Sequence, residues 1–393
     1  MNGYAVIHPG LEHCVQDELK AAGISGEVVP GGVQFGTDAW SIAALAHQLR
    51  TPSQLLLEVG AGPARTPDQL SVLVRKLPWR ALLHPQSEVV AQVSARGSAL
   101  RFKDAAARTV VTAVRESLKG PFVPDRGLRP RIPQLVQVRI VDDYVTVSLD
   151  AGGELLHRRG WRTEAGKAPL RENLAACMLF LAGWTGQDAL LDPFCGAGTI
   201  PIEAALLSLG RSPFGRRFFA CDEWILPVVK GRRTDKKDTA GQPGRGRDHR
   251  KPRGRGLDGR SGAERDRGPR APAPLPVAIL GSDHHAPTVL TAQDNARRAG
   301  VATLFRHLDV ANVEPPAATG TIVTNPPYGE RLGDRVGGVY VQFGRVLRER
   351  FGGWRVLFLT TNTDLAAKVD KRAERIAHFK NGGILVGAYA LEL

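Results

Sequence analysis

From about residue 160 to the end of the chain, short apolar runs alternate with amphipathic stretches. The apolar runs ALLDPF, VAILGSD, TIVTNPP and RVLFLTT are separated by segments with apolar residues at helical spacing, for example TVLTAQDNARRAG. Strands that alternate with helices predict a parallel sheet covered by helices on both faces. Two last apolar runs flank Asn-Gly-Gly at 381–383, which predicts a hairpin with an antiparallel strand at the sheet edge. We therefore expect a doubly wound, Rossmann-like α/β domain that closes with a β-hairpin.

The residues before this domain show a mixed α+β pattern in two units. Residues 1–60 contain an apolar run, a helical pattern and the strand pair EVVPGGVQF with a Pro-Gly-Gly turn. Residues 61–152 combine two helical patterns with SEVVAQVSA and the pair LVQVRIVDDYVTVSLD. The alternation of apolar and polar residues in this pair fits strands with one solvated face. Neither unit carries a catalytic or metal-binding signature.

The charge of the chain is unbalanced. Its 53 Lys and Arg residues against 39 Asp and Glu residues give a formal net charge of +14, which favours a polyanionic partner, most often nucleic acid. Fifteen of the basic residues and six of the acidic ones lie between residues 230 and 274. This segment has too few apolar residues to offset the entropy lost on ordering, so we expect a disordered basic insertion at 231–274.

Several classes of protein are disfavoured by what the sequence lacks. No stretch has the roughly 20 apolar residues of a membrane helix and no leader pattern begins the chain, so we expect a cytoplasmic protein with no membrane partner. The four cysteines form no C-x-x-C pair. We therefore expect free thiols, and neither disulfides nor a metal site. A monomer is the default expectation.

A glycine-containing turn follows the first strand of the α/β domain. The motif DPFCGAGT at 192–199 places Gly196 and Gly198 between a strand and a helix, where open α/β sheets bind cofactors. A dinucleotide fingerprint would need a third glycine three residues after Gly198, but Pro201 stands there. An NAD site is therefore disfavoured.

Acidic residues accompany this turn in an order that suits S-adenosylmethionine. Asp192 ends the first strand, Asp283 ends the next, and Asp309 follows in FRHLDV. A tight turn would lie against the methionine part, while one acid would accept from the ribose hydroxyls and another from the adenine amine. His284 would lie at the edge of the ribose. Cys195 lies inside the turn, so we expect it to fill space and not to act as a nucleophile.

The strand TIVT at 321–324 ends abruptly at Asn-Pro-Pro-Tyr. Pro326 disfavours a helical conformation for Asn325, Pro327 stiffens the next step, and neither proline offers an N–H to continue a strand. The resulting rigid loop would present the Asn325 carboxamide oxygen and the Pro326 carbonyl to an exocyclic amine. Holding both amine hydrogens would aim the nitrogen lone pair at a methyl group. Tyr328 would supply a face on which an extracted base stacks.

Together these motifs resemble the guanosine-N2 RNA methyltransferases that carry an N-terminal THUMP domain. The resemblance rests on DPFCGAGTIPIEAA, TNPPYGERLG, APLRENLAA, PGLE, GGVQF, LRTPSQLLL and DDYVTVSLD, which span nearly the whole chain. It implies a ferredoxin-like segment at 1–60, an RNA-docking THUMP domain at 61–152, a linker at 153–167 and a class I methyltransferase domain at 168–393. The basic insertion is not part of the family pattern.

The resemblance also assigns roles to single residues. The expected cofactor-binding residues, from the resemblance and the motifs together, are Asp192, Phe194, Cys195, Gly196, Gly198, Thr199, Asp283, His284, Asp309 and Asn325. The expected catalytic residues are Asn325, Pro326, Pro327 and Tyr328.

Three functions follow as hypotheses. The first is transfer of a methyl group from S-adenosylmethionine to the N2 amine of a guanosine in structured RNA, with tRNA slightly favoured over large-subunit rRNA because one catalytic domain is present. The second is an adenine-N6 methyltransferase acting on RNA or DNA, since Asn-Pro-Pro-Tyr also suits that amine. The third is a non-catalytic RNA-binding protein, which intact Asp192 and Asn325 motifs disfavour.

Overall fold

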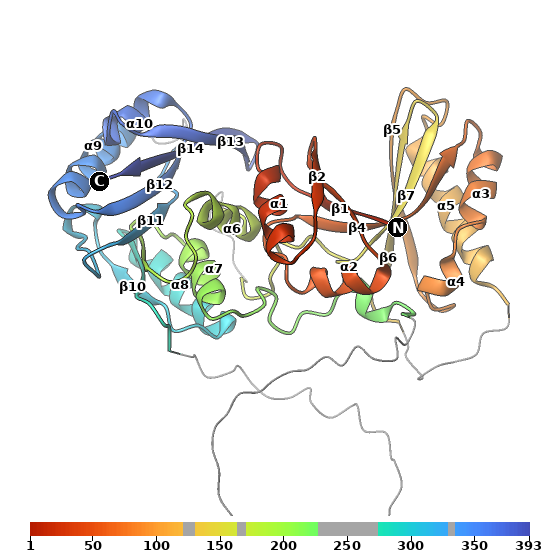
Figure 1. Ribbon diagram of the computed structural model, residues 1–393, viewed down its shortest axis with the longest axis horizontal. Coiled ribbons are helices and arrows are strands. Elements are labelled where there is room, and N and C mark those ends of the chain that lie inside the picture. The colour runs from red at the N-terminus through yellow and green to blue at the C-terminus, as the bar shows by residue number, and fades with distance from the viewer. Residues whose placement is uncertain (121–129, 163–169, 227–273, 329–334) are drawn as a thin grey trace, which may run out of the picture. The chain divides into compact units, whose positions relative to one another are not determined.

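A computed structural model describes residues 1–120, 130–162, 170–226, 274–328 and 335–393. Their strands form two seven-stranded sheets, one in each half of the chain (Figure 1). The expected basic insertion, apart from Pro274, lies outside the described residues, as do residues 163–167 of the expected linker.

The N-terminal sheet has the strand order β2-β3-β1-β4-β7-β6-β5. Its strands are β1 (Asn2–Val6), β2 (Gly26–Val29), β3 (Gly32–Gly36), β4 (Gln54–Pro63), β5 (Val89–Arg96), β6 (Gln134–Val141) and β7 (Tyr144–Asp150). The helices of this half are α1 (Glu12–Ala21), α2 (Ala39–Ala46), α3 (Pro67–Arg75), α4 (Trp79–Leu82) and α5 (Lys103–Leu118). Strand β4 crosses residue 60, where the sequence suggests a boundary, and pairs with β1 on one side and β7 on the other. The two expected units therefore share one sheet.

The C-terminal sheet has the strand order β10-β9-β8-β11-β12-β14-β13. Its strands are β8 (Ala189–Asp192), β9 (Ile279–Asp283), β10 (Leu304–His307), β11 (Gly320–Thr324), β12 (Trp354–Thr360), β13 (Glu374–Asn381) and β14 (Ile384–Glu392). The helices are α6 (Glu172–Leu181), α7 (Thr199–Ser208), α8 (Ala286–Ala299), α9 (Arg335–Arg350) and α10 (Thr363–Val369), with the 3₁₀ turns η1 (Ala220–Glu223) and η2 (Val310–Asn312). The expected α/β domain and its closing hairpin are confirmed.

We expected the antiparallel strand of the hairpin to lie at the edge of the sheet, and the structure places it one position further in. β14 pairs antiparallel with both β12 and β13, so the antiparallel strand lies inside the sheet. The edge strand β13 runs parallel to β12. The sequence predicts the turn between the two strands correctly but does not show which strand takes the inner place.

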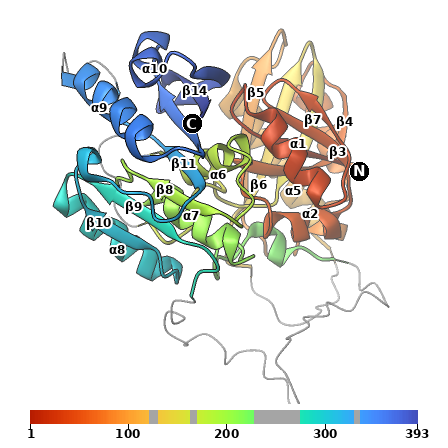
Figure 2. The same ribbon diagram turned by 60° about the vertical axis from the view of Figure 1, so that its left-hand side comes forward.

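Helices cover both faces of the C-terminal sheet, because neighbouring strand residues point to opposite sides. Ile322 belongs to a buried cluster with Phe343 of α9, whereas the next residue, Val323, belongs to the cluster that contains Ile202 of α7 and Ala292 of α8. Figure 2 shows α9 and α10 on one side of these strands and α7 and α8 on the other.

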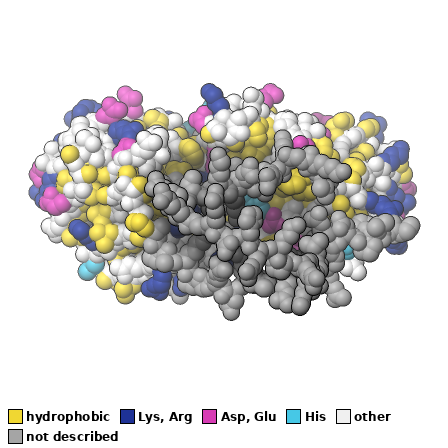
Figure 3. Space-filling view, turned by 60° about the horizontal axis from the view of Figure 1, so that its bottom comes forward, with side chains coloured by type: hydrophobic (Ala, Val, Ile, Leu, Met, Phe, Trp, Pro, Cys, Tyr) yellow, Lys and Arg dark blue, Asp and Glu magenta, His cyan; other side chains and the backbone are white. Residues whose placement is uncertain are grey.

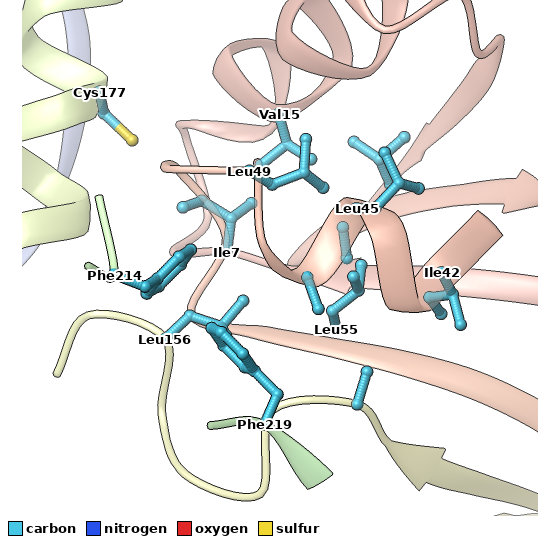
Figure 4. Packing of buried hydrophobic residues seen from close by; sticks show 14 of the residues in the cluster. Ile7, Val15, Ile42, Leu45, Leu49, Leu55, Leu156, Cys177, Phe214 and Phe219 are labelled. Carbon is cyan, nitrogen blue, oxygen red and sulfur yellow. The ribbon is translucent and has the colours of Figure 1, made fainter. Parts of the chain in front are cut away.

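The larger of these clusters also contains the core of the N-terminal sheet. Figure 4 shows Ile7, Leu49 and Leu55 beside Leu156 and Phe219, all in one buried cluster.

All four cysteines are buried and free, as expected. No helix among the described residues has the length and apolar character needed to cross a lipid bilayer. Figure 3 shows one face of the molecule, on which the basic and acidic side chains of the described residues are mixed.

Candidate functional site

The candidate site lies where the strand order of the C-terminal sheet reverses. β8 pairs in parallel with β9 on one side and with β11 on the other, so the chain leaves β8 in one direction and later returns in the other. Ligands of open α/β sheets bind at the carboxyl ends of strands at such a switch point. The motifs DPFCGAGT and TNPPY begin at the last residues of β8 and β11, which brings the two halves of the predicted site together.

A hydrogen bond joins these two strand ends. The Thr324 hydroxyl donates to Asp192 Oδ1 over 2.6 Å, and the Phe194 N–H donates to the same oxygen over 3.1 Å. Asp192 is 1% exposed, and this burial raises the pKa of its carboxyl to about 7. The two hydrogen bonds oppose this rise, and the carboxylate of Asp283 adds to it. Asp192 thus braces the two loops, a role that the sequence does not indicate.

The glycine turn has a backbone conformation that favours glycine. Gly196 and Gly198 have φ angles of +52° and +83°, in the left-handed region. A Cβ on Gly198 would lie 2.8 Å from the Phe305 ring, whereas a Cβ on Gly196 meets no heavy atom of the described residues within 4 Å. Gly198 therefore allows close packing inside the fold. Gly196 borders space that no described atom occupies within 4 Å of a Cβ.

Asp283 at the end of β9 holds this turn. Its Oδ2 accepts from the Gly196 N–H over 3.1 Å and its Oδ1 accepts from the His285 N–H over 2.9 Å. His284 is beside it, with Nδ1 3.4 Å from Asp283 Oδ1 and a side chain that is 73% exposed. Asp309 is exposed and caps η2 by accepting from the Ala311 N–H over 2.8 Å. These acids keep further lone pairs with which hydroxyl and amine donors of a nucleoside could bond.

Three residues of the turn point into the protein. Phe194 packs edge-on against Phe343 with ring centroids 5.4 Å apart, and the Thr199 hydroxyl bonds the guanidinium of Arg162. Cys195 is 6% exposed; burial and then the carboxylates of Asp192 and Asp283 raise the pKa of its thiol. A thiol that stays protonated at neutral pH is a poor nucleophile, which agrees with the expected packing role.

The Asn-Pro-Pro-Tyr loop contains a buried hydrogen-bond acceptor to which none of the described residues donates. Among the described residues, no hydrogen-bond partner lies within reach of Asn325 Oδ1, although this atom is buried. Leaving a buried polar atom unpaired costs about 1–3 kcal/mol, so such an atom in a native fold requires an explanation. Pro326 is buried and Pro327 is half-buried. A ligand amine would satisfy the Asn325 oxygen.

Tyr328 is anchored by a residue that the sequence analysis does not single out. The Asn381 side-chain amide donates to the Tyr328 hydroxyl over 2.7 Å, and Asn381 is 7% exposed. Burial raises the pKa of Tyr328, while the bond from Asn381 opposes the rise. Asn381 ends β13 at the turn of the hairpin. The hairpin thus fixes the ring expected to stack on a base.

Two further contacts were missed because nothing local in the sequence signals them. Asn295 on α8 donates to the Ala197 carbonyl over 3.0 Å and so holds the glycine turn from outside. Arg162 bonds the Leu170 carbonyl over 3.1 Å besides Thr199, and its Nε lies 3.3 Å from a Glu172 oxygen. A long-range partner of this kind appears only when the chain is folded.

Comparisons with known proteins identify methyltransferases as relatives of this chain. The chain is 31% identical over 396 residues to the ribosomal RNA large subunit methyltransferase K/L of Syntrophotalea carbinolica, covering 97% of this chain but 52% of that protein. The chain therefore spans about half the length of the curated relatives it matches. The crystal structure of SMU.472 complexed with SAH superimposes with a TM-score of 0.79 at 25% identity, over 100% of this chain and 97% of that one.

A second solved structure is that of a predicted N6-adenine-specific DNA methylase from Listeria monocytogenes. It is 26% identical, has a TM-score of 0.75 and covers 99% of this chain and 95% of that one. A model of the RlmL ferredoxin-like domain matches residues 3–56, in agreement with the ferredoxin-like segment expected at 1–60. A model of the RMKL-like methyltransferase domain matches residues 159–387, more than half of the chain, and the chain therefore belongs to the RMKL-like methyltransferase family.

Proposed function

We propose that this protein transfers a methyl group from S-adenosylmethionine to the exocyclic N2 amine of a guanosine in RNA. The observation that carries this proposal is the buried, unpaired Asn325 Oδ1 beside a cofactor turn. The cofactor is S-adenosylmethionine, since the chain belongs to a methyltransferase family and SMU.472, similar over its full length, is complexed with SAH. S-adenosylmethionine supplies an electrophilic methyl group on a sulfonium.

Different residues at the sheet edge would bind different parts of this cofactor. The open space at Gly196 would receive its methionine part. Asp283 would accept from the ribose hydroxyls with His284 at the ribose edge, and Asp309 would accept from the adenine amine. Asp192 and Thr199 would act by fixing the turn, because the hydrogen bonds of both side chains run to Thr324, Phe194 and Arg162.

The Asn325 loop would orient the amine. Asn325 Oδ1 and the Pro326 carbonyl would each accept one N–H, which aims the nitrogen lone pair at the methyl carbon. Positioning of this kind supplies much of the rate when the nucleophile is weak. Asn325 has no basic atom, so the proton released after transfer passes to water. The Tyr328 ring, held by Asn381, would stack on the flipped base and Pro327 would keep the loop rigid.

Large-subunit rRNA is the RNA class that the comparisons support. The Syntrophotalea relative is named for it, whereas the tRNA expected from the sequence rests only on the single catalytic domain. We further propose that residues 61–152, with α3, α5 and β5 to β7, form the THUMP domain and dock this RNA.

The test is to incubate the protein with methyl-labelled S-adenosylmethionine and, separately, unmodified rRNA, tRNA or duplex DNA, and to identify the labelled nucleoside. We expect N2-methylguanosine from rRNA. Label from tRNA alone would keep the chemistry and change the RNA class. No label from any pool would contradict an enzymatic function and favour the non-catalytic RNA-binding protein.

A matched pair of variants tests the role of Asn325. Asn325→Ala should lower the transfer rate by about 10²-fold or more, the usual effect of removing one preorganised polar group, with little change in RNA affinity. Asn312→Ala removes an exposed asparagine of the same domain and should leave the rate unchanged. Equal rates for the two variants would contradict the assigned role.

An adenine-N6 methyltransferase is the second candidate, favoured by the likeness to the Listeria protein. The same pair of acceptors would hold an adenine amine. Labelled N6-methyladenosine in the experiment above would establish this alternative.

A further inference from the structure

A cavity lies beside the N-terminal sheet, and none of the predicted site residues lines it. Its volume is about 1150 Å³, and it is bordered by the N-terminal sheet, residues 152–162, residues 217–218 and the start of α6. Its walls carry six arginines against two glutamates, Glu154 and Glu172. The cavity is therefore strongly cationic.

Three of these arginines have structural bonds. Arg159 pairs with the buried Glu203 over 3.0 Å, Arg162 bonds Thr199 and lies 3.3 Å from Glu172, and Arg217 donates to backbone carbonyls such as that of Arg158 over 2.7 Å. The other three, Arg131, Arg158 and Arg171, are exposed. Arg171 also contacts a side chain, since its Nη1 lies 3.4 Å from His8 Nε2. A ligand can therefore approach these three residues from solvent.

An aromatic side chain stands among these cations. Phe218 lines the cavity and is 68% exposed, an unusual place for a phenylalanine in a region where Phe219 is fully buried. Exposed aromatic rings between cationic side chains are typical of surfaces that bind single-stranded nucleic acid, where rings stack on bases and cations contact phosphates.

One residue of the cavity wall is next in sequence to a residue that holds the candidate site. Gly382 lines it and is the neighbour of Asn381, whose side chain bonds the Tyr328 hydroxyl. A strand lying in the cavity would thus approach the loop at which the target base is expected.

We propose that this cavity binds a single-stranded RNA segment next to the target nucleotide, with Arg131, Arg158 and Arg171 on its phosphates and Phe218 stacked on an unpaired base. This inference rests on the proposed function in taking RNA as the substrate. His157 in the cavity wall fits it: burial, and then the nearby Arg171, Arg159 and Arg158, lower the pKa of its ring to about 4. The wall therefore has a positive field that favours an anion.

RNA affinity, not methylation, tests the proposal. The probe is a fluorescein-labelled, unstructured RNA of about 12 nucleotides, with SAH present and anisotropy measured at several salt concentrations. Arg158→Glu and Arg171→Glu should each weaken binding at least about tenfold and flatten the salt dependence, because a phosphate contact is lost. Arg345→Glu, an exposed arginine on α9 outside the cavity, makes the same charge change and should bind as the wild type does.

The aromatic contact has its own pair of variants. Phe218→Leu should weaken binding by about fivefold or more, and Phe218→Trp should retain it, since stacking needs a ring and not merely apolar volume. Leu290→Ala, at a residue that is 63% exposed on α8, serves as the control for loss of an exposed apolar side chain. Equal binding by Phe218→Leu and the wild type would overturn the stacking contact and with it the single-stranded ligand.

The outcomes separate this proposal from the proposed function. If the wild type labels no RNA but its binding depends on these side chains, the cavity proposal stands and the function fails. If the wild type methylates RNA and the arginine variants bind RNA normally, the cavity proposal is wrong. Displacement of the RNA by polyglutamate at equal charge concentration would also overturn it, in favour of an acidic protein partner.

Discussion

The Thr324 hydroxyl and the Asp192 carboxyl, separated by 2.6 Å, join the two loops of the candidate site. Thr324 precedes Asn325, which we assign to the amine, and Asp192 begins the turn that we assign to the cofactor. This contact therefore helps to fix the distance between the two loops, together with the direct pairing of β8 and β11. Because both residues are buried, the contact is shielded from water and is strong for its kind.

Asp192 should make the stability of the protein depend on pH. The pKa of its carboxyl is raised from 3.8 to about 7 in the folded state, so the folded state binds this proton more tightly than the unfolded state. The protonated Asp192 therefore contributes fully to the free energy of unfolding below about pH 4. This contribution is lost as the pH rises through 7, by at most about 1.4 kcal/mol per pH unit. Urea denaturation from pH 4 to 8 should show this fall in the wild type relative to Asp192→Asn.

Asp150 provides the control for this measurement. Its pKa is raised to about 6, again chiefly by burial, but it lies in the N-terminal sheet. Asp150→Asn should change the pH dependence of the free energy of unfolding in the same direction as Asp192→Asn, over a narrower range of pH. It should leave the methyl-transfer rate unaffected. A difference between wild type and Asp192→Asn that is flat with pH would contradict the raised pKa.

The contact between Asn381 and Tyr328 should behave as a single functional unit. Tyr328→Phe and Asn381→Ala both remove the 2.7 Å hydrogen bond, while the former keeps the ring. Each should lower the transfer rate by about tenfold, and the double variant should be little slower than either single one, with a coupling energy of about 0.5–1.5 kcal/mol. Rates that multiply in the double variant would show that the two side chains act independently.

Much of this site could be predicted from the sequence because its parts are local. The turn at Gly196 and Gly198 and the loop at Asn325 depend on glycine and proline, whose backbone restrictions are readable from single residues. The strand order could not be read in the same way. The place of β14 between β12 and β13 depends on pairing between distant strands, so the hairpin was predicted and its orientation in the sheet was not.

Residues that act through distant partners also escaped prediction. Asn381 looks like an ordinary turn residue in the sequence, and only the fold brings its amide to Tyr328. The motif predicts that Asp192 binds the cofactor, and the fold adds hydrogen bonds from Thr324 and Phe194 that make it a brace between the two loops. The assignment of this acid to the strand end was sound, but its burial depends on neighbours that the local motif does not contain.

The two glycines of the cofactor turn should respond differently to alanine. Gly198→Ala places a Cβ 2.8 Å from the Phe305 ring at a φ of +83°, so it should lower the free energy of unfolding by more than the roughly 1–2 kcal/mol of the left-handed backbone alone. Gly196→Ala meets no described atom within 4 Å and should cost only that backbone term. It should nevertheless weaken S-adenosylmethionine binding, measured by calorimetry, because the new methyl group enters the cofactor space. Unchanged cofactor affinity in Gly196→Ala would place the cofactor elsewhere.

The buried cluster around Glu203 should be the most sensitive charged site in the described residues. Glu203 on α7 pairs with Arg159 over 3.0 Å and lies 3.7 Å from Arg50, with no exposed side-chain surface of its own. Glu203→Ala would leave two buried guanidinium groups without their carboxylate, which typically costs about 3–5 kcal/mol. Denaturant unfolding should show this loss, whereas Asp294→Ala, which breaks the exposed pair with Arg297, should cost less than about 1 kcal/mol. Because α7 begins at the cofactor turn, the rate of Glu203→Ala should fall together with its stability; a stable but inactive variant would instead indicate that the cluster positions the turn without supporting the fold.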